Sequence, residues 1–150
     1  MRFHLIDRIE TFTPREHITA RKVTSVDETY WQDTGSGPAM PFGLALEALC
    51  QSATWLIMLS TDHRLRAALL AVGEATAHRA VRPGEVLRMR ATIESMTEEA
   101  ALLDGTVTAD GEDVLSASGI LCALIDAERL DDPADTRRMA HQLQGGGPVG

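Results

Sequence analysis

The sequence predicts an α+β fold in which a strongly twisted antiparallel β-sheet wraps around one long central α-helix. The first observation is the segment from Pro38 to Met58, which is apolar nearly all round and carries a single charge, Glu47. That pattern is typical of a buried helix, because a surface helix has a charged face. The second observation is the chain after Arg66, where strand-like stretches alternate with hairpin turns. Successive hairpins build an antiparallel sheet.

Each element follows from a local pattern. Residues 17–25, HITARKVTS, alternate as a strand does, and the polar residues 27–29 predict a short helical turn. The central helix should begin near Pro41, because proline is favoured in a first helical turn. It should end between Ser60 and His63. Further strands are expected at residues 68–80, 86–95, 100–108 and 114–125, with turns at 82–84 and 110–112. Together these elements predict the hotdog architecture.

Length and composition fit one globular domain. The chain has 150 residues, of which 44% are hydrophobic and 24% are charged, enough to bury a sizeable core. We expect this domain over residues 1–130 and a tail over 131–150, with a short amphipathic helix at 131–141 and a disordered Gly-rich end at 145–150. The net charge of -8 argues against nucleic acid as a partner, because phosphate binding needs a basic face.

Neither the cysteines nor the apolar segments predict a metal site or a membrane span. Cys50 and Cys122 lie in apolar surroundings without metal-ligand spacing, so we expect reduced core residues and no metal or other cofactor. The first residues, MRFHLIDRIETF, lack the apolar stretch of a signal peptide. The apolar helix is interrupted by Glu47 and followed by a polar loop. We therefore expect a cytoplasmic protein.

Glu47 is the first candidate for a functional residue. Burying an unpaired carboxylate costs several kcal/mol, roughly, unless it is hydrogen-bonded or neutralised. Gln51 lies four residues later on the same helical face and can hydrogen-bond toward the same cavity. The pair predicts a polar site inside an apolar environment. The alternative is a structural carboxylate that caps a loop or pairs with an arginine.

Three stretches resemble one known family, the hotdog-fold 3-hydroxyacyl-acyl-carrier-protein dehydratases of fatty-acid and polyketide synthesis. FHLIDRIETF, from Phe3, resembles the opening segment of the family, and VGEATAHRAVRPGEVL resembles its strand followed by a Pro-Gly turn. Between them, seven residues match the family pattern P-x-M-P-G-x-L-x-x-E-A-x-x-Q: Pro38, Met40, Pro41, Leu44, Glu47, Ala48 and Gln51.

The resemblance implies a homodimer with two tunnels, each accepting an acyl chain on a phosphopantetheine arm, and an active site between the subunits. In the family a histidine removes the α-proton, a helix carboxylate handles the departing hydroxyl, and a backbone N–H polarises the thioester carbonyl. Glu47 matches the carboxylate and Phe42 matches the N–H position. The expected substrate-binding residues are Thr34, Met40, Pro41, Phe42, Gly43 and His78.

The sequence departs from the family pattern at two positions. The loop that should hold the histidine reads YWQDTGSGP from Tyr30 to Pro38 and contains none. Counting back from Pro38 places Asp33 at the histidine position, and counting forward from Tyr30 places Thr34 there. Phe42 stands where the family has glycine. These changes leave the predicted fold intact and open the question of which group replaces the base.

Three functions remain open on the sequence. In the first, a 3-hydroxyacyl thioester on acyl carrier protein or coenzyme A is dehydrated with Asp33 as base and Glu47 as acid; the alternative for Asp33 is an Asx-type turn. In the second, Glu47 serves as nucleophile or as base for water in thioester hydrolysis, with Gln51 or Thr34 placing the water. In the third, the protein is a non-catalytic acyl-binding or partner subunit.

Arginines supply a candidate partner surface. Arg79 and Arg82 flank the Pro83-Gly84 turn, and Arg88 and Arg90 follow on the next expected strand. Carrier proteins are acidic, and a local basic cluster can bind one in spite of the overall negative charge. The alternative is ordinary surface charge.

Overall fold

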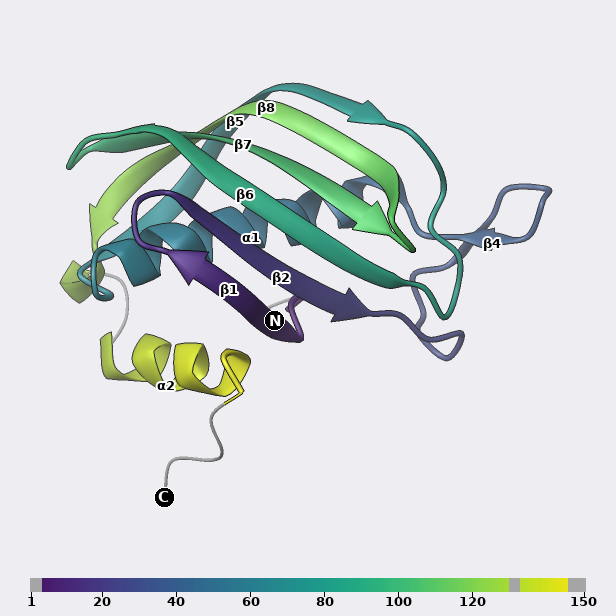
Figure 1. Cartoon of the computed structure of the whole chain (residues 1–150), viewed down its shortest axis with the longest axis horizontal. Helices are drawn as coiled ribbons and strands as arrows, with labels where there is room; N and C mark the ends of the chain where they lie inside the picture. The colour runs from purple at the N-terminus through teal and green to yellow at the C-terminus, as the bar shows by residue number, and fades with distance from the viewer. Residues whose placement is uncertain (1–3, 130–132, 146–150) are drawn as a thin grey trace.

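The sheet and the central helix form the body of the molecule. The computed structural model describes residues 4–129 and 133–145. A six-stranded antiparallel sheet with strand order β1-β2-β6-β7-β8-β5 curves around α1 (Figure 1). This arrangement confirms the predicted α+β hotdog fold. The elements are β1 Arg8–Thr13, β2 His17–Val23, β3 Gln32–Asp33, β4 Pro38–Ala39, α1 Phe42–Ser60, β5 Leu65–Ala77, β6 Val86–Met96, β7 Ala100–Ala109, β8 Glu112–Asp126, the 3-10 turn Ala127–Arg129 and α2 Pro133–Leu143.

Most predicted boundaries agree with these elements, and four regions differ. In place of a helical turn at residues 27–29, a tight turn is closed by a hydrogen bond from Glu28 N to Ser25 O at 3.2 Å. Residues 78–80 lie outside β5, which ends at Ala77. β1 and the small β3–β4 hairpin were not predicted, because β3 and β4 have two residues each and show no periodicity.

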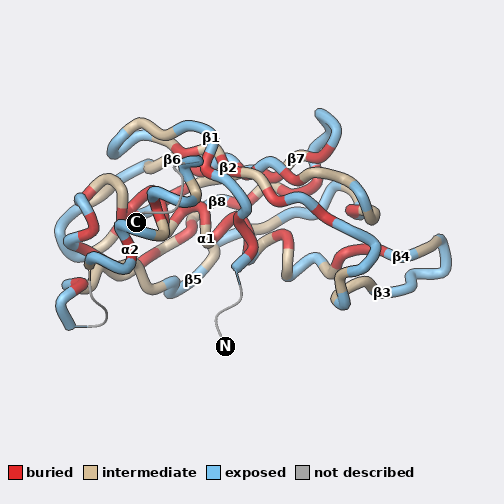
Figure 2. The backbone as a smooth tube through the Cα atoms, turned by 90° about the horizontal axis from the view of Figure 1, so that it is seen from below, coloured by how far each residue is buried: buried red, intermediate tan, exposed pale blue. Residues whose placement is uncertain are grey.

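Helix α1 packs its apolar side into the concave face of the sheet, as the buried residues in the middle of Figure 2 show. It is long and apolar enough to cross a membrane by length and composition, and more than half of it is buried inside this protein. The expectation that it is buried all round is wrong for the single chain. Phe42, Gly43 and Glu47 are exposed and Gln51 is half-buried. A single sheet covers one side of a helix, so these residues remain uncovered.

The two cysteines are free and buried in the core. Burial in apolar surroundings raises the pKa of the Cys50 thiol to about 11, with a smaller contribution from the Glu47 carboxylate. Burial also raises the pKa of Cys122. Both thiols are therefore protonated, unreactive core groups, as the sequence predicts.

The end of the chain forms a short helix below the sheet (Figure 1). α2 overlaps the helix predicted at 131–141 and ends two residues later, at Leu143, and Ala140 of α2 belongs to the hydrophobic core. The glycine-rich end was expected to be disordered, and residues 146–150 of it lie outside the described residues.

Candidate active site at the start of the central helix

A cavity of about 430 Å³ lies where the chain enters α1. Four segments form its wall: the β3–β4 hairpin, the first turn of α1, the end of β5 with the connection that follows it, and the start of β8. The lining residues are Gln32, Thr34, Ala39, Met40, Pro41, Phe42, Ala45, Ala77, His78, Arg79, Ala80, Val81 and Val114. The cavity therefore brings together five of the six predicted substrate-binding residues and leaves out Gly43.

The first turn of α1 borders this cavity through Phe42 and Ala45. Pro41 precedes the helix with φ -56° and ψ 136°, and no side chain caps the helix. Met40 N donates to Val81 O at 3.0 Å, which fixes the chain just before the helix begins. The first N–H groups of a helix have no partner within it, and the helix dipole favours negative charge there. This end of α1 can therefore stabilise negative charge on a thioester oxygen.

Arg82 holds the β3–β4 hairpin against the cavity. Its guanidinium donates to Gly37 O at 3.1 Å, to Pro38 O at 2.9 Å and to Ser36 Oγ at 3.4 Å. These three contacts join two segments more than forty residues apart in the sequence. The outer wall of the cavity thus depends on one arginine, which the sequence predicts as part of a basic partner surface and which in the structure holds the hairpin.

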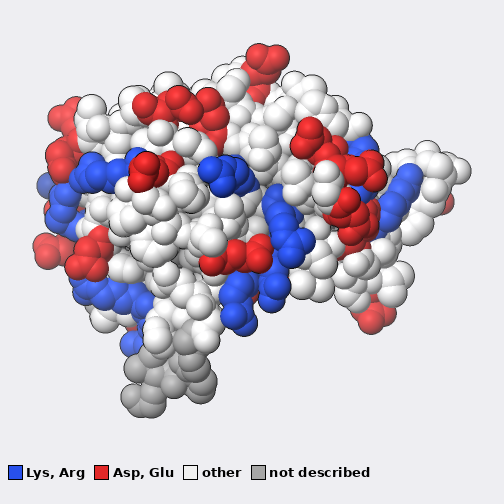
Figure 3. All heavy atoms as spheres, viewed as in Figure 1, with Lys and Arg blue, Asp and Glu red and all other residues white. Residues whose placement is uncertain are grey.

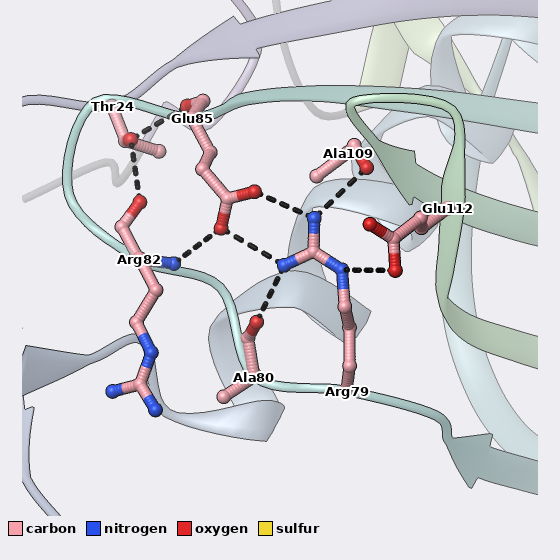
Figure 4. Close-up of polar contacts among 7 residues, drawn as sticks. All are labelled: Thr24, Arg79, Ala80, Arg82, Glu85, Ala109 and Glu112. Carbon is pink, nitrogen blue, oxygen red and sulfur yellow. Dashed lines mark hydrogen bonds and ion pairs between the residues drawn. The ribbon is translucent and has the colours of Figure 1, made fainter. Parts of the chain in front are cut away.

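Arg79 and Glu85 form the second support of the cavity (Figure 4). Arg79 donates to both carboxylate oxygens of Glu85 and to the backbone oxygens of Ala80 and Ala109. The Glu85 carboxylate also accepts from Arg82 N at 2.7 Å. The Arg79 guanidinium is the main cause of a Glu85 pKa of about 2, well below its usual value. Arg79 is therefore part of the framework and is not a free surface cation.

Glu47 and Gln51 are hydrogen-bonded to each other on the uncovered side of α1. Gln51 Nε2 donates to Glu47 Oε1 at 3.3 Å, and Gln51 Oε1 accepts from Leu5 N at 2.8 Å. The bond to the buried Leu5 fixes the orientation of the Gln51 amide, so its NH₂ points toward Glu47. The pairing predicted from the four-residue spacing is present. Neither side chain lines the cavity of its own chain.

Asp33 lies on the β3–β4 hairpin but does not line the cavity. Its neighbours Gln32 and Thr34 do, and alternate residues of a strand point to opposite sides. Asp33 Oδ1 accepts from Gly35 N at 2.9 Å. This is the Asx-type turn that the sequence offered as the alternative to a catalytic base.

His78 lines the cavity, but its ring is bonded toward β8. His78 Nε2 lies 2.8 Å from Ser116 Oγ, and His78 N donates to Val114 O at 2.8 Å. Within the described part of the chain, no three His, Cys, Asp or Glu side chains are placed to hold a metal ion.

The sheet, its single apolar helix and the cavity at the helix start define a hotdog-fold protein. Solved structures share the fold: a putative thioesterase from Lactococcus lactis (TM-score 0.68, 13% identity, covering 81% of this chain and 93% of that one) and a Streptococcus mutans protein bound to acetyl CoA (TM-score 0.66, 14% identity, covering 84% and 94%). At these identities the likeness concerns the fold alone.

Sequence relatives define the family more narrowly. Residues 1–118 match the model of the FabA-like domain. The 3-hydroxyacyl-[acyl-carrier-protein] dehydratase FabZ of Latilactobacillus sakei is 32% identical, over 75% of this chain and 82% of the relative. The FabZ of Polynucleobacter necessarius is 34% identical, over 81% of this chain and 83% of the relative. The chain belongs to the FabA-like dehydratase family, which confirms the resemblance.

Proposed function

We propose that this protein removes water from 3-hydroxyacyl thioesters carried on an acyl carrier protein or on coenzyme A. The observation that carries the proposal is the hydrogen-bonded pair Glu47 and Gln51. The pair lies on the same helix whose first turn lines the cavity through Phe42 and Ala45. Membership of the FabA-like family supports this reaction. The apolar helix packs into the protein's own sheet, which supports a soluble protein, and we propose a cytoplasmic location.

The site requires a second copy of the chain in this proposal. β5 is an edge strand of the sheet and exposes Leu69 and Leu70, 44% and 62% accessible. Pairing β5 with the same strand of a partner would remove the open edge and cover these leucines. It would also cover the exposed side of α1 and enclose Glu47 between the subunits. We therefore propose a homodimer with two shared sites.

The dehydration uses one base and one acid. The base removes the proton from the carbon next to the carbonyl, the electrons of that bond form the carbon–carbon double bond, and the bond to the 3-hydroxyl breaks. Protonated Glu47 donates its proton to the departing hydroxyl, which leaves as water. The backbone N–H of Phe42 stabilises the charge on the thioester oxygen. Asp33 remains the candidate base, and its position away from the cavity requires the hairpin to turn toward the site.

Thioester hydrolysis is the second candidate, and the position of Asp33 favours it. Here the Glu47 carboxylate takes a proton from water, the hydroxide adds to the carbonyl carbon, and the carbon–sulfur bond breaks to release a thiol and an acid. This route uses Glu47 and the helix N-terminus and needs neither a histidine nor Asp33. The third candidate is an acyl-binding or partner subunit, which would bind an acyl chain in the cavity without catalysing a reaction.

Mass spectrometry of the protein with 3-hydroxyacyl and simple acyl thioesters, each on carrier protein and on coenzyme A, separates the three. Loss of water from the 3-hydroxyacyl thioesters supports dehydration, and release of free acid supports hydrolysis. If none of the thioesters changes, acyl binding without catalysis is the function that the result supports. Glu47→Gln should lower either reaction about 100-fold or more. Asp33→Asn should be equally severe only under dehydration. Glu128→Gln, an exposed carboxylate outside the site, is the matched control and should leave the rates unchanged.

A further inference from the structure

We propose that the cavity at the start of α1 holds the acyl chain of the substrate and accepts short chains only, because Leu49 of α1 closes its inner end. This inference rests on the proposed function, since it assigns the acyl specificity of the same site. It makes Ala45 and Leu49 the residues that determine the length limit.

The two ends of the cavity differ in polarity. Gln32, Thr34 and His78 line its outer part and are exposed. Five other lining residues are buried, and all of them are apolar: Ala39, Met40, Ala45, Val81 and Val114. Ligand pockets combine an apolar lining with a few polar groups in this way. An acyl chain is apolar, so it gains free energy by leaving water for the buried end.

The walls of the cavity offer no free charge to an ionic ligand. The outer wall is the β3–β4 hairpin, which projects at the right of Figure 3 with mostly uncharged atoms at its surface. Asp33 is the one charged residue among residues 32–39, and its carboxylate accepts from Gly35 N. Arg79 also lines the cavity, but its guanidinium is bonded to both carboxylate oxygens of Glu85. The cavity is therefore suited to a neutral chain.

Leu49 closes the inner end of the cavity. Phe42, Ala45 and Leu49 follow one another at spacings of three and four residues, so they lie on one face of α1. Phe42 and Ala45 line the cavity. Leu49, one turn further, is fully buried, and a Cβ on Gly105 of β7 would lie 2.6 Å from Leu49 Cδ1. Helix and sheet are in contact at Leu49, so the space between them ends there.

The distance along α1 sets the length limit. The backbone N–H of Phe42 binds the thioester oxygen in the proposed reaction, so the acyl chain begins at this end of the cavity. From Phe42 to Leu49 the helix rises by about 10 Å, at about 1.5 Å per residue. An extended chain advances by about 1.2 Å per bond, as an extended peptide does with about 3.6 Å over three bonds. The cavity therefore holds roughly eight carbons at most.

The uncovered side of α1 is a poorer place for the chain. Glu47 is two residues from Ala45 and so lies about 200° away around the helix, on the opposite side from the cavity. Glu47 and Gln51 are bonded to each other there, and Gln51 also accepts from Leu5 N. An acyl chain on this side would cover polar groups. The apolar cavity and the polar pair thus have separate roles.

The test is the affinity of S-alkyl coenzyme A thioethers for the parent chain, measured by calorimetry with methyl, butyl, octyl and dodecyl groups. These probes carry neither a 3-hydroxyl nor a thioester carbonyl, so they cannot be dehydrated or hydrolysed. From methyl to butyl the affinity should rise about fourfold for each added CH₂. From octyl to dodecyl it should not rise further. A rise that continues to dodecyl would overturn the proposal, because the chain would then lie outside the cavity.

Ala45→Leu fills the inner end of the cavity. It should lower the affinity for the S-butyl probe about tenfold or more, since the chain no longer enters, and leave the S-methyl probe unchanged. Ala134→Leu makes the same replacement at an exposed position of α2 and should bind both probes as the parent does. Urea denaturation checks that both variants are folded. Equal S-butyl affinities of the parent and Ala45→Leu would overturn the proposal.

Leu49→Val tests the limit independently, because it removes volume in place of adding it. The chain length at which the affinity stops rising should increase in this variant, and an unchanged length would contradict the role of Leu49.

Turnover assays keep the length limit separate from the proposed function. A length limit in binding without turnover of any 3-hydroxyacyl thioester would contradict dehydration and leave the acyl cavity supported. Dehydration of 3-hydroxydodecanoyl substrates as fast as of 3-hydroxybutyryl substrates would support the reaction and overturn the length limit.

Discussion

At the residue scale, Gly105 determines how closely α1 approaches the sheet. A Cβ at this position on β7 would lie 2.6 Å from Leu49 Cδ1 and 2.8 Å from Arg90 O. Leu49 belongs to α1 and is fully buried. Because real Cβ atoms do not approach backbone oxygens this closely, any larger residue must push the helix or the strand away.

Gly105→Ala should lower the free energy of unfolding by about 1–3 kcal/mol, the usual cost of overpacking a core. Gly43→Ala is the matched comparison, because a Cβ there meets nothing within 4 Å and alanine is favoured over glycine in a helix by about 0.5–1 kcal/mol. Urea denaturation of both variants checks the contrast. Equal effects would mean that the close contact at Gly105 is relieved at no cost. Adding Leu49→Val should recover part of the loss.

Glu47 shows what a residue pattern can and cannot predict. The spacing to Gln51 predicts their hydrogen bond because residues four apart lie on one face of a helix, and the bond is present. The single charge in an apolar helix also predicted burial, and this is wrong for the single chain, where Glu47 is exposed. Composition shows that a helix is apolar, but the side covered by the sheet depends on tertiary packing.

At the scale of elements, the strands and α1 could be predicted because their periodicity extends over many residues. The β3–β4 hairpin could not, since its strands are too short for any period. Its position depends on Arg82, which contacts it from the β5–β6 connection. No pattern in the sequence links these two segments, so the wall of the cavity had to be found in the structure.

Arg82→Met should release the hairpin while keeping much of the apolar stem of the side chain. The three donor contacts to residues 36–38 would be lost, and we expect faster hydrogen exchange of the Thr34 amide, which donates to Gly37 O at 3.3 Å. In substrate assays the KM should rise several-fold, because the outer wall of the cavity is displaced. Arg138→Met, on the exposed side of α2, is the control. Unchanged exchange at Thr34 would show that the hairpin is held by its own contacts.

At the scale of the whole molecule, the far end of α1 is closed by a buried histidine. His63 is 5% exposed and has a left-handed backbone, with φ 63°. Its N–H donates to Met58 O at 2.8 Å, which satisfies the end of the helix. His63 Nδ1 is buried without a hydrogen-bond partner among the described residues. Arg137 of α2 packs over this region and donates to Asp62 O at 3.1 Å.

Stability should therefore decrease as the pH falls below about 6.5, the reference value for histidine. Burial, reinforced by the positive charge of Arg137 and only partly opposed by Asp62, lowers the pKa of His63 in the folded protein. Between the lowered pKa and 6.5 the unfolded chain binds more protons than the folded one, so the free energy of unfolding falls with decreasing pH. The stabilisation that comes from neutral His63 is complete above pH 6.5. It is lost as the pH falls from 6.5 through the pKa of His63 in the folded protein.

Urea denaturation between pH 8 and pH 5.5 measures this dependence. His63→Asn is the variant of choice, because asparagine tolerates the left-handed backbone and does not titrate. The parent should lose stability over this range more steeply than His63→Asn. His17→Asn, in which a half-buried histidine of β2 is replaced, should keep the slope of the parent. If the free energy of unfolding fell equally with pH in the parent and in His63→Asn, another group would cause the pH dependence. The contact between α2 and this end of α1 would then not depend on protonation of His63.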